Sequence, residues 1–176
     1  LLSIVQVANE KNAKSFIFSS SATVYGDTKE SCVTEETPLG KPLNPYGHTK
    51  ILGEKILESG KQEFKTILLR YFNPVGAHES SKIGELPNGV PNNLVPYITQ
   101  TAAEKREKLT VFGNDYNTKD GTCIRDFIHV VDLAEAHVAA LNYSDKMSEA
   151  VDVFNVGTGM GNTVLELIET FEEVNN

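Results

Sequence analysis

Short apolar runs alternate with longer segments of helical periodicity along the first half of the chain. Residues 15–19 form an apolar, aromatic run that ends in small polar residues, which is typical of a buried strand that meets a loop. Residues 46–64 carry apolar side chains at helical spacing. A second apolar run over residues 66–71 predicts another strand, which stops at an Asn-Pro pair. This order of strand, helix and strand predicts a parallel sheet covered by helices.

The second half of the chain continues the alternation with weaker signals. Asp132 and Glu135 suit the cap of a helix that begins at Asp132. Thr163 and Glu166, placed just before an apolar stripe, predict a capping box and a final helix. The four elements expected before that helix are in turn a helix, a short strand, a helix and a strand, over residues 95–106, 109–112, 132–143 and 151–156. The whole pattern predicts an α/β fold.

Three irregular stretches separate these elements. Residues 25–45 and 73–93 are rich in Gly, Pro, Asn and Ser without strong periodicity, and long loops of this kind are commonly lids or binding loops. Residues 157–161 contain three glycines between a strand and a helix, which superficially suggests a phosphate-binding loop. They lack the full glycine fingerprint, so we expect a tight structural turn there.

Composition limits the classes of partner. The chain has 176 residues, enough for one buried core, and a net charge of -8 without a run of Lys or Arg. Nucleic acid is therefore not an expected partner, and no apolar stretch is long enough for a membrane span. Cys32 and Cys123 match no metal or redox spacing, so we expect reduced thiols and a cytoplasmic protein. The four histidines are scattered, and no metal site is expected.

Tyr46 followed four residues later by Lys50 is the clearest chemical signal. On a helix this spacing places both side chains on one face. A phenol titrates near pH ~10, and a nearby ammonium group helps a tyrosine to act as a base by favouring the phenolate. Ser19, Ser20 and Ser21 lie at the end of the first strand, where α/β sheets bind ligands. Taken singly, the pair could lie on a solvated helix face and the serines could satisfy backbone groups in a turn.

Six separated segments of the chain share their residues, in the same order, with one enzyme family. They are residues 16–26, 44–50, 69–78, 91–94, 112–116 and 125–130. On these segments the chain resembles the extended short-chain dehydrogenase/reductase superfamily and, within it, the UDP-galactose 4-epimerase (UDP-glucose 4-epimerase) family. The resemblance implies an NAD-binding Rossmann-like, doubly wound parallel sheet with elements of a smaller C-terminal substrate domain.

The same resemblance implies how the chain divides. Residues 1–72 would be the C-terminal half of the NAD-binding domain and would carry the catalytic residues. Residues 73–176 would supply substrate-binding loops and small-domain elements, interleaved with returning elements of the first domain. The family's first strand with its glycine-rich turn, its acidic residue for the adenosine ribose and its C-terminal end find no match here. We therefore expect this chain to correspond to the middle half of an epimerase and to be inactive alone.

The resemblance also implies a mechanism for the full-length protein, the interconversion of UDP-galactose and UDP-glucose in galactose metabolism. Tyr46 would remove the proton of the sugar 4-hydroxyl while hydride leaves C4 for NAD. The 4-keto sugar would turn over in the pocket and take hydride back on its other face. Lys50 would hold the nicotinamide ribose and favour the phenolate. Ser21 would position the sugar oxygen and relay its proton.

The implied binding residues extend beyond these three. Phe72 would contact the cofactor, together with Ser21, Tyr46 and Lys50, and Asn73 would contact the sugar or the diphosphate. A guanidinium suits diphosphate oxygens because it binds them in a bidentate way, although Arg125 could instead pair with a carboxylate such as Asp126. The UDP side of the site would be formed by Asn93, Leu94, Thr110, Val111, Phe112 and Arg125. The resemblance further implies a homodimer.

Two alternatives remain open at this point. A sugar-nucleotide 4,6-dehydratase or decarboxylase of the same superfamily typically has a carboxylate just after the serine-loop hydroxyl, where this chain has Ala22 and Thr23. A catalytically silent regulator that binds NAD or a nucleotide sugar could keep the fold but would not need Ser21, Tyr46 and Lys50 together. Cys123 and Thr110 depart from residues common at these positions in the family.

Overall fold

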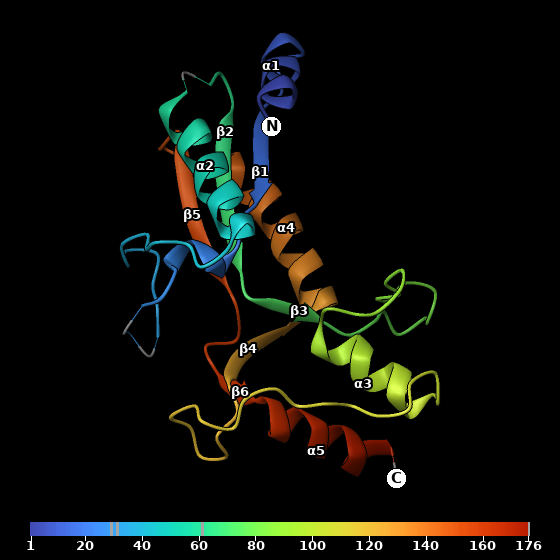
Figure 1. The fold of residues 1–176 in the computed structure, drawn as a ribbon. Coiled ribbons are helices and arrows are strands. Elements are labelled where there is room, and N and C mark those ends of the chain that lie inside the picture. Colours follow the sequence, from blue (N-terminus) through green and yellow to red (C-terminus); the bar gives the residue numbers. More distant parts are fainter. Residues whose placement is uncertain (29, 31, 61, 176) are drawn as a thin grey trace. The chain divides into compact units, whose positions relative to one another are not determined.

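Two compact units make up the structure. The computed structural model describes residues 1–28, 30, 32–60 and 62–175. The first unit comprises Leu1–Phe72 and Asp132–Gly157, and the second comprises Asn73–Val131 and Thr158–Asn176 (Figure 1). The chain therefore passes three times between the units, and each unit contains segments that are distant in sequence.

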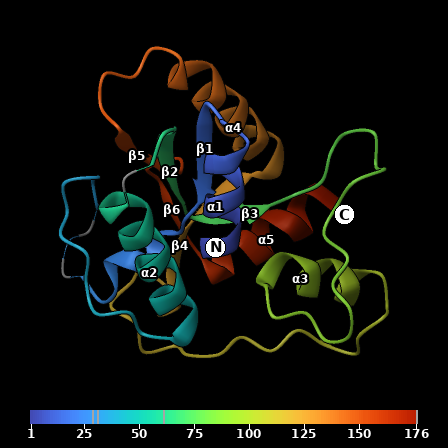
Figure 2. The ribbon, with the colours of Figure 1, turned by 90° about the horizontal axis from the view of Figure 1, so that it is seen from above.

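A parallel sheet forms the centre of the first unit. The strand order is β1-β2-β5, and both neighbouring pairs are parallel. Helices α2 and α4 lie on opposite faces of this sheet (Figure 2). The elements concerned are β1 (Ser15–Ser19), α2 (Pro45–Ser59), β2 (Lys65–Tyr71), α4 (Val130–Ser144) and β5 (Val151–Val156). The predicted parallel sheet with covering helices is thus confirmed.

The apolar core of this unit lies between the sheet and two helices. Val5 of α1 (Leu2–Glu10) and Leu57 of α2 pack against Leu68 of β2 and Phe64. The rings of Phe16 and Phe64 stack with their centres 5.5 Å apart. Helices α1 and α2 therefore cover the same face of the sheet, because Val5 and Leu57 belong to one apolar cluster with Phe64 and Leu68.

The opposite face of the sheet is covered by α4. Its His137 lies with Nε2 3.3 Å from the Ser19 hydroxyl, and its ring centre is 6.3 Å from that of Tyr71. In the last turn of α4, the rings of Tyr143 and Phe154 pack edge to face with their centres 5.5 Å apart. Side chains at alternate positions of the strands thus face different helices, as the two-residue period of a strand requires.

Helix α2 begins as expected and ends early. The side-chain oxygen of Asn44 accepts a hydrogen bond from the N–H of Gly47 at 2.8 Å, and Pro45 occupies the first helical turn. The helix ends at Ser59 because Gly60 has an extended backbone. The prediction that the helix continues to Phe64 is wrong. Phe64 lies outside the helix, in the segment that leads into β2, and packs in the core.

Helix α4 begins two residues before its predicted start. The ring nitrogen Nδ1 of His129 accepts the N–H of Val131 at 3.2 Å, and helical backbone starts at Val130. Asp132 lies inside the first turn, so its predicted role as the cap is wrong. An acidic residue there still interacts favourably with the positive end of the helix.

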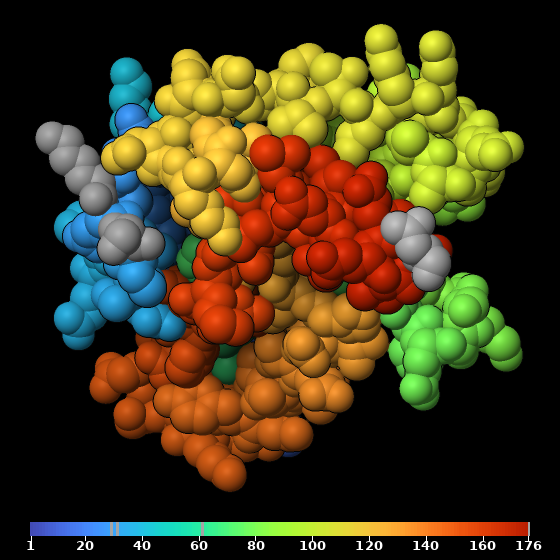
Figure 3. All heavy atoms as spheres, turned by 90° about the horizontal axis from the view of Figure 1, so that it is seen from below, coloured from blue at the N-terminus to red at the C-terminus, as the bar shows by residue number. Residues whose placement is uncertain are grey.

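The second unit has a small mixed sheet. Its order is β3-β4-β6, with β3 parallel and β6 antiparallel to β4. On the surface of this unit, α5 lies beside residues 103–123 (red and yellow in Figure 3). The elements are β3 (Asn73–Val75), α3 (Leu94–Ala102), β4 (Ile124–His129), β6 (Gly161–Thr163) and α5 (Val164–Asn175).

The predicted capping box of the last helix is confirmed. The N–H of Thr163 donates to Glu166 Oε2 at 2.8 Å, and the N–H of Glu166 donates to the Thr163 hydroxyl at 3.2 Å. Glu166 also pairs with Lys119, and Asp120 accepts the hydroxyl of Thr163. The bond from Lys119 and that from the Thr163 N–H lower the pKa of Glu166, and the bond from Thr163 lowers the pKa of Asp120.

Other expectations for this unit are corrected. Residues 109–112 are irregular rather than a strand, and Phe112 is 86% exposed. Without a neighbouring strand, an apolar run of four residues has nothing to pair with. Helix α3 is shorter than predicted and ends at Ala102, shortly before Glu104, whose φ of 56° is not helical. The strands β3, β4 and β6 had no clear signal in the sequence.

The glycine-rich segment before α5 is a tight turn, as expected. The carboxylate of Asp126 accepts the N–H of Thr158 at 3.0 Å, its hydroxyl at 2.7 Å and the N–H of Gly159 at 2.9 Å. Because the backbone N–H groups of this turn are directed at a side chain of the same unit, the turn has a structural role.

Candidate active site

The loop after β1 places two serine hydroxyls in different surroundings. Ser21 has an extended backbone and precedes a short 3₁₀ helix, η1 (Ala22–Tyr25). Its oxygen accepts the N–H of Thr23 at 3.3 Å and the Thr23 hydroxyl at 3.0 Å. Both bonds use the Ser21 oxygen as acceptor, so its O–H remains able to donate to a ligand. Ser20 is fully buried and donates to Glu54.

Tyr46 and Lys50 lie on successive turns at the start of α2. The Lys50 ammonium donates to the carbonyl oxygen of Ser19 at 2.7 Å and lies 5.2 Å from the centre of the Tyr46 ring. Tyr46 is 48% exposed. Tyr46 therefore lies in the first turn of α2, with a positively charged group close to its ring. This arrangement can take a proton from a hydroxyl group and return it.

The four predicted residues of the first unit gather at the carboxyl ends of its strands. They are Ser21, Tyr46, Lys50 and Phe72. Ser21 follows β1, and Phe72 follows β2, where its N–H donates to the carbonyl oxygen of Val156 at 3.1 Å. The ammonium group of Lys50 is hydrogen-bonded to the carbonyl oxygen of Ser19, the last residue of β1. These positions are at the carboxyl ends of parallel strands, where open α/β sheets bind ligands. Among the described residues, no hydrogen bond joins Ser21 directly to Tyr46.

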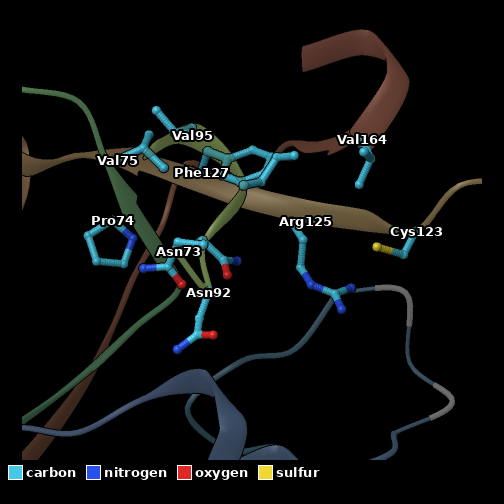
Figure 4. A pocket seen from close by; sticks show the side chains of 11 residues that line it. Asn73, Pro74, Val75, Asn92, Val95, Cys123, Arg125, Phe127 and Val164 are labelled. Atoms are coloured by element: carbon cyan, nitrogen blue, oxygen red, sulfur yellow. The ribbon is translucent and has the colours of Figure 1, made fainter. Parts of the chain in front are cut away.

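A pocket of about 240 Å³ lies within the second unit. Four predicted substrate residues line it, from three separate segments of the chain: Asn73, Asn93, Leu94 and Arg125. Figure 4 shows the polar ends of Asn73, Asn92 and Arg125 on one side and the apolar side chains of Val75, Val95 and Phe127 on the other. A pocket with an apolar wall and a few polar groups is typical of a small-molecule site.

Arg125 presents an exposed guanidinium group at this pocket. Its Nη1 donates to the carbonyl oxygen of Ile124 at 2.7 Å. Within the described part of the chain it forms no ion pair, because the carboxylate of the neighbouring Asp126 is taken up by the turn at Thr158. The alternative of an Arg125–Asp126 pair is therefore wrong, and the guanidinium can bind an anionic group.

The two predicted asparagines are held by their amide groups. Asn73 Nδ2 donates to the carbonyl oxygen of Asp126 at 3.0 Å, which leaves its Oδ1 as an acceptor. Asn93 Nδ2 donates to Glu85 at 2.7 Å, and Asn93 precedes the first residue of α3, Leu94. Three further predicted residues lie apart from the pocket lining, in an exposed irregular segment: Thr110, Val111 and Phe112.

Comparison with known proteins identifies the family. The model of the NAD-dependent epimerase/dehydratase family matches residues 1–157. The chain belongs to this family. The resemblance seen in the six sequence segments and the Rossmann-like fold class are thereby confirmed, and the family depends on NAD.

Individual relatives are similar over nearly the whole chain. The UDP-glucose 4-epimerase of Bacillus subtilis (strain 168) is 53% identical over 176 residues, which cover 97% of this chain and 51% of the relative. The crystal structure of UDP-glucose 4-epimerase from Bifidobacterium longum in complex with NAD+ and UDP has a TM-score of 0.91 at 49% identity, covering 98% and 52%. That of the Stenotrophomonas maltophila enzyme, with NAD and formylated UDP-arabinopyranose, has a TM-score of 0.93 at 44% identity, covering 99% and 52%. The chain spans about half the length of the curated relatives it matches.

The residues at the carboxyl ends of the strands of the first unit fit the nicotinamide end of the family's cofactor. Lys50 has three N–H donors and directs one at Ser19, so two remain for the hydroxyl groups of a ribose. Tyr46 is half-exposed and lies with its ring beside this ammonium group. Loops at the carboxyl ends of the strands are where this family's fold binds a dinucleotide.

Several residues around these sites were missed by the sequence analysis. Glu54 and Arg70 form a buried ion pair beside the serine loop, and the only signal was a charged residue inside the apolar strand at Arg70. Asn92, Cys123 and Phe127 line the pocket of the second unit. Phe127 could have been found from the alternation of β4, because it shares a face of that strand with Arg125.

None of the helices in the described ranges has the length and apolar character needed to cross a bilayer. Over the same ranges, no group of three or more His, Cys, Asp and Glu side chains is arranged to hold a metal ion.

Proposed function

We propose that the whole protein containing this chain interconverts UDP-galactose and UDP-glucose. The observation that carries the proposal is the association of Ser21, Tyr46 and Lys50 at the carboxyl ends of a parallel sheet. Relatives named UDP-glucose 4-epimerase are about 50% identical over this region, which supports the same reaction.

Each residue of this group has a role that its chemistry supports. Tyr46 takes the proton of the sugar 4-hydroxyl and returns it after the sugar has turned over. Lys50 stabilises the phenolate and binds the ribose hydroxyls of the cofactor, while Ser21 donates a hydrogen bond to the sugar oxygen. Phe72 contacts the cofactor. NAD, when bound, would supply an acceptor for the hydride of C4 and a donor of hydride to the opposite face of the resulting keto carbon, so it would not be consumed.

The pocket of the second unit is proposed to hold the UDP part of the substrate. Arg125 binds diphosphate oxygens in a bidentate way. The amide oxygen of Asn73 accepts a hydrogen bond from a hydroxyl group of the sugar or from one next to the diphosphate. Asn93 and Leu94 line the same pocket. Thr110, Val111 and Phe112 lie outside the pocket lining, and we propose that their segment contacts the nucleotide mainly through its backbone.

We further propose the domain roles implied by the family. Residues 1–72 belong to the NAD-binding domain, and residues 73–176 supply substrate-binding elements together with returning parts of the first domain. The interleaved units of the structure support this division. A cytoplasmic homodimer is proposed for the whole protein.

Incubation of the purified whole protein with UDP-galactose tests the function. Chromatography should detect UDP-glucose without added reductant, and added NAD should not be consumed. A 4-keto-6-deoxy product would instead assign the protein to the dehydratases. Binding of UDP-galactose without any product would support the alternative of a silent regulator.

A further inference from the structure

A buried ion pair lies directly beneath the serine loop. Glu54 of α2 and Arg70 of β2 are 0% and 4% exposed. Arg70 donates to both carboxylate oxygens of Glu54, at 3.0 Å from Nε and 2.7 Å from Nη2. The two parallel bonds fix the plane of the carboxylate. Burial lowers the pKa of Arg70, but its hydrogen bonds to Glu54 and Tyr25 outweigh burial and raise it.

The ion pair is hydrogen-bonded to residues on both sides of Ser21. Ser20, immediately before Ser21, donates its hydroxyl to Glu54 Oε1. Tyr25, four residues after Ser21, accepts a bond from Arg70 Nη1 at 3.1 Å. The hydroxyl of Tyr25 in turn donates to Asn155 Oδ1 of β5 at 2.6 Å. Both ends of the loop that carries Ser21 are therefore fixed by the same two charged side chains.

The pair is also aligned with the other two catalytic candidates. Glu54 lies four residues after Lys50 and eight after Tyr46, so all three project from the same side of α2. Lys50 holds the carbonyl oxygen of Ser19, and Glu54 holds the hydroxyl of Ser20. Two consecutive turns of the helix thus bind two consecutive residues of the chain, the last residue of β1 and the first residue of the loop that carries Ser21.

Stability alone gives a weak reason for such a pair. Replacing a buried ion pair by apolar residues of similar volume is often neutral or stabilising, because two charges must otherwise lose their hydration. Fixed geometry is a better reason, since displacement of a reacting group by about 1 Å can lower a rate by about 100-fold.

We propose that Glu54, held by Arg70, is a positioning residue that sets the place of Ser21 relative to Tyr46 and Lys50. It acts through the hydroxyl of Ser20 and contacts neither substrate nor cofactor. This inference rests on the proposed function for its kinetic consequence, although the ordering of the serine loop is independent of which reaction is catalysed.

The variant Ser20→Ala in the whole protein removes the link and leaves the ion pair in place. We expect kcat for UDP-galactose to fall about 10- to 100-fold while KM stays within about threefold. Amide hydrogen exchange of residues 20–26 should become faster. Ser144→Ala is the matched control, because it removes another buried serine hydroxyl of the same unit, bonded to Leu141 at 2.7 Å. It should keep the wild-type kcat.

The double variant Glu54→Leu/Arg70→Met separates positioning from folding. We expect a thermal midpoint at or above that of the wild type together with a lowered kcat. A wild-type kcat in Ser20→Ala or in a folded double variant would overturn the proposal, as would an equal loss in Ser144→Ala. If the wild type does not convert UDP-galactose, the proposed function fails. Hydrogen exchange of residues 20–26 alone then decides whether Glu54 positions the serine loop. Unchanged exchange of residues 20–26 in Ser20→Ala would overturn the inference in that case.

Discussion

The ammonium nitrogen of Lys50 lies 5.2 Å from the centre of the Tyr46 ring, one helical turn further along α2. The same ammonium is held by the carbonyl oxygen of Ser19 at the end of β1. One side chain therefore connects the helix that carries the phenol to the strand that leads into the serine loop. The charge of Lys50 therefore lies over the Tyr46 ring at the point where the strand enters the serine loop.

Replacing Tyr46 by Phe removes the phenol oxygen and keeps the ring. We expect kcat for UDP-galactose to fall about 10²- to 10⁴-fold in the whole protein, with little change in substrate binding. Steady-state kinetics and isothermal titration with UDP measure the two effects separately. Tyr143→Phe is the control, since Tyr143 lies on α4 and bonds to Asp152 rather than to the site. A wild-type kcat in Tyr46→Phe would exclude this phenol as the base.

Replacing Lys50 by Met keeps much of the side-chain length and removes the charge. We expect kcat to fall by about 10²-fold or more, because loss of a donor or charge at a reacting oxygen has effects of that size. The purified protein should also retain less NAD, measured by absorbance after denaturation. Lys55→Met, an exposed change on the same helix, should leave both quantities unchanged. Full retention of NAD in Lys50→Met would contradict the ribose contact.

The parts of the fold that could be predicted depend on local signals. The run at residues 15–19 and the Thr163–Glu166 capping box each carry their information within a few residues, and both are present in the structure. Strand β4 escaped prediction because it places two charged residues, Arg125 and Asp126, side by side. The carboxylate of Asp126 binds the backbone of Thr158, which only the tertiary fold brings close, and Arg125 lies at the pocket of the second unit. Residues 109–112 show the reverse error, since β propensity without a neighbouring strand produces no strand.

The residues of the candidate site also differ in whether a local signal could predict them. Tyr46 and Lys50 could be found from their spacing, because a helix alone determines that they share a face. The contact between Glu54 and Ser20 could not, because it joins residues 34 positions apart through the packing of α2 on β1. Gly53 reflects that packing, since a Cβ atom there would lie 2.5 Å from the ring of Phe18.

Replacing Arg125 by Ala should weaken binding of the nucleotide. The loss of a charge-assisted hydrogen bond typically lowers affinity about 10- to 100-fold. Isothermal titration of the whole protein with UDP measures this effect. Arg125→Lys should show an intermediate loss, because an ammonium keeps the charge without the bidentate geometry. Arg106→Lys is the control, since Arg106 bonds to Gln100 outside the pocket lining. Unchanged affinity in Arg125→Ala would remove Arg125 from the proposed site.

Acid should loosen the start of α5 in the second unit. The pKa of Glu166 is lowered from its ordinary value of 4.5, first by the hydrogen bond from Lys119 and then by the N–H of Thr163. The pKa of Asp120 is lowered from 3.8, chiefly by the hydroxyl of Thr163. A carboxyl group with a lowered pKa in the folded state stabilises that state above its ordinary pKa. This stabilisation is lost as the pH falls through 4.5 and 3.8 toward the lower folded values.

Hydrogen exchange of the α5 amides, corrected for the intrinsic rate, should therefore show less protection near pH 3 than near pH 6. Glu166→Gln keeps the capping box, because a Gln side chain can also accept the Thr163 N–H, but removes the ion pair with Lys119. This variant should lose protection near pH 6 and show a smaller difference between the two conditions. Glu172→Gln changes an exposed carboxylate later in the same helix and should behave as the wild type. A wild-type pH dependence in Glu166→Gln would mean that another group controls the acid sensitivity of this helix.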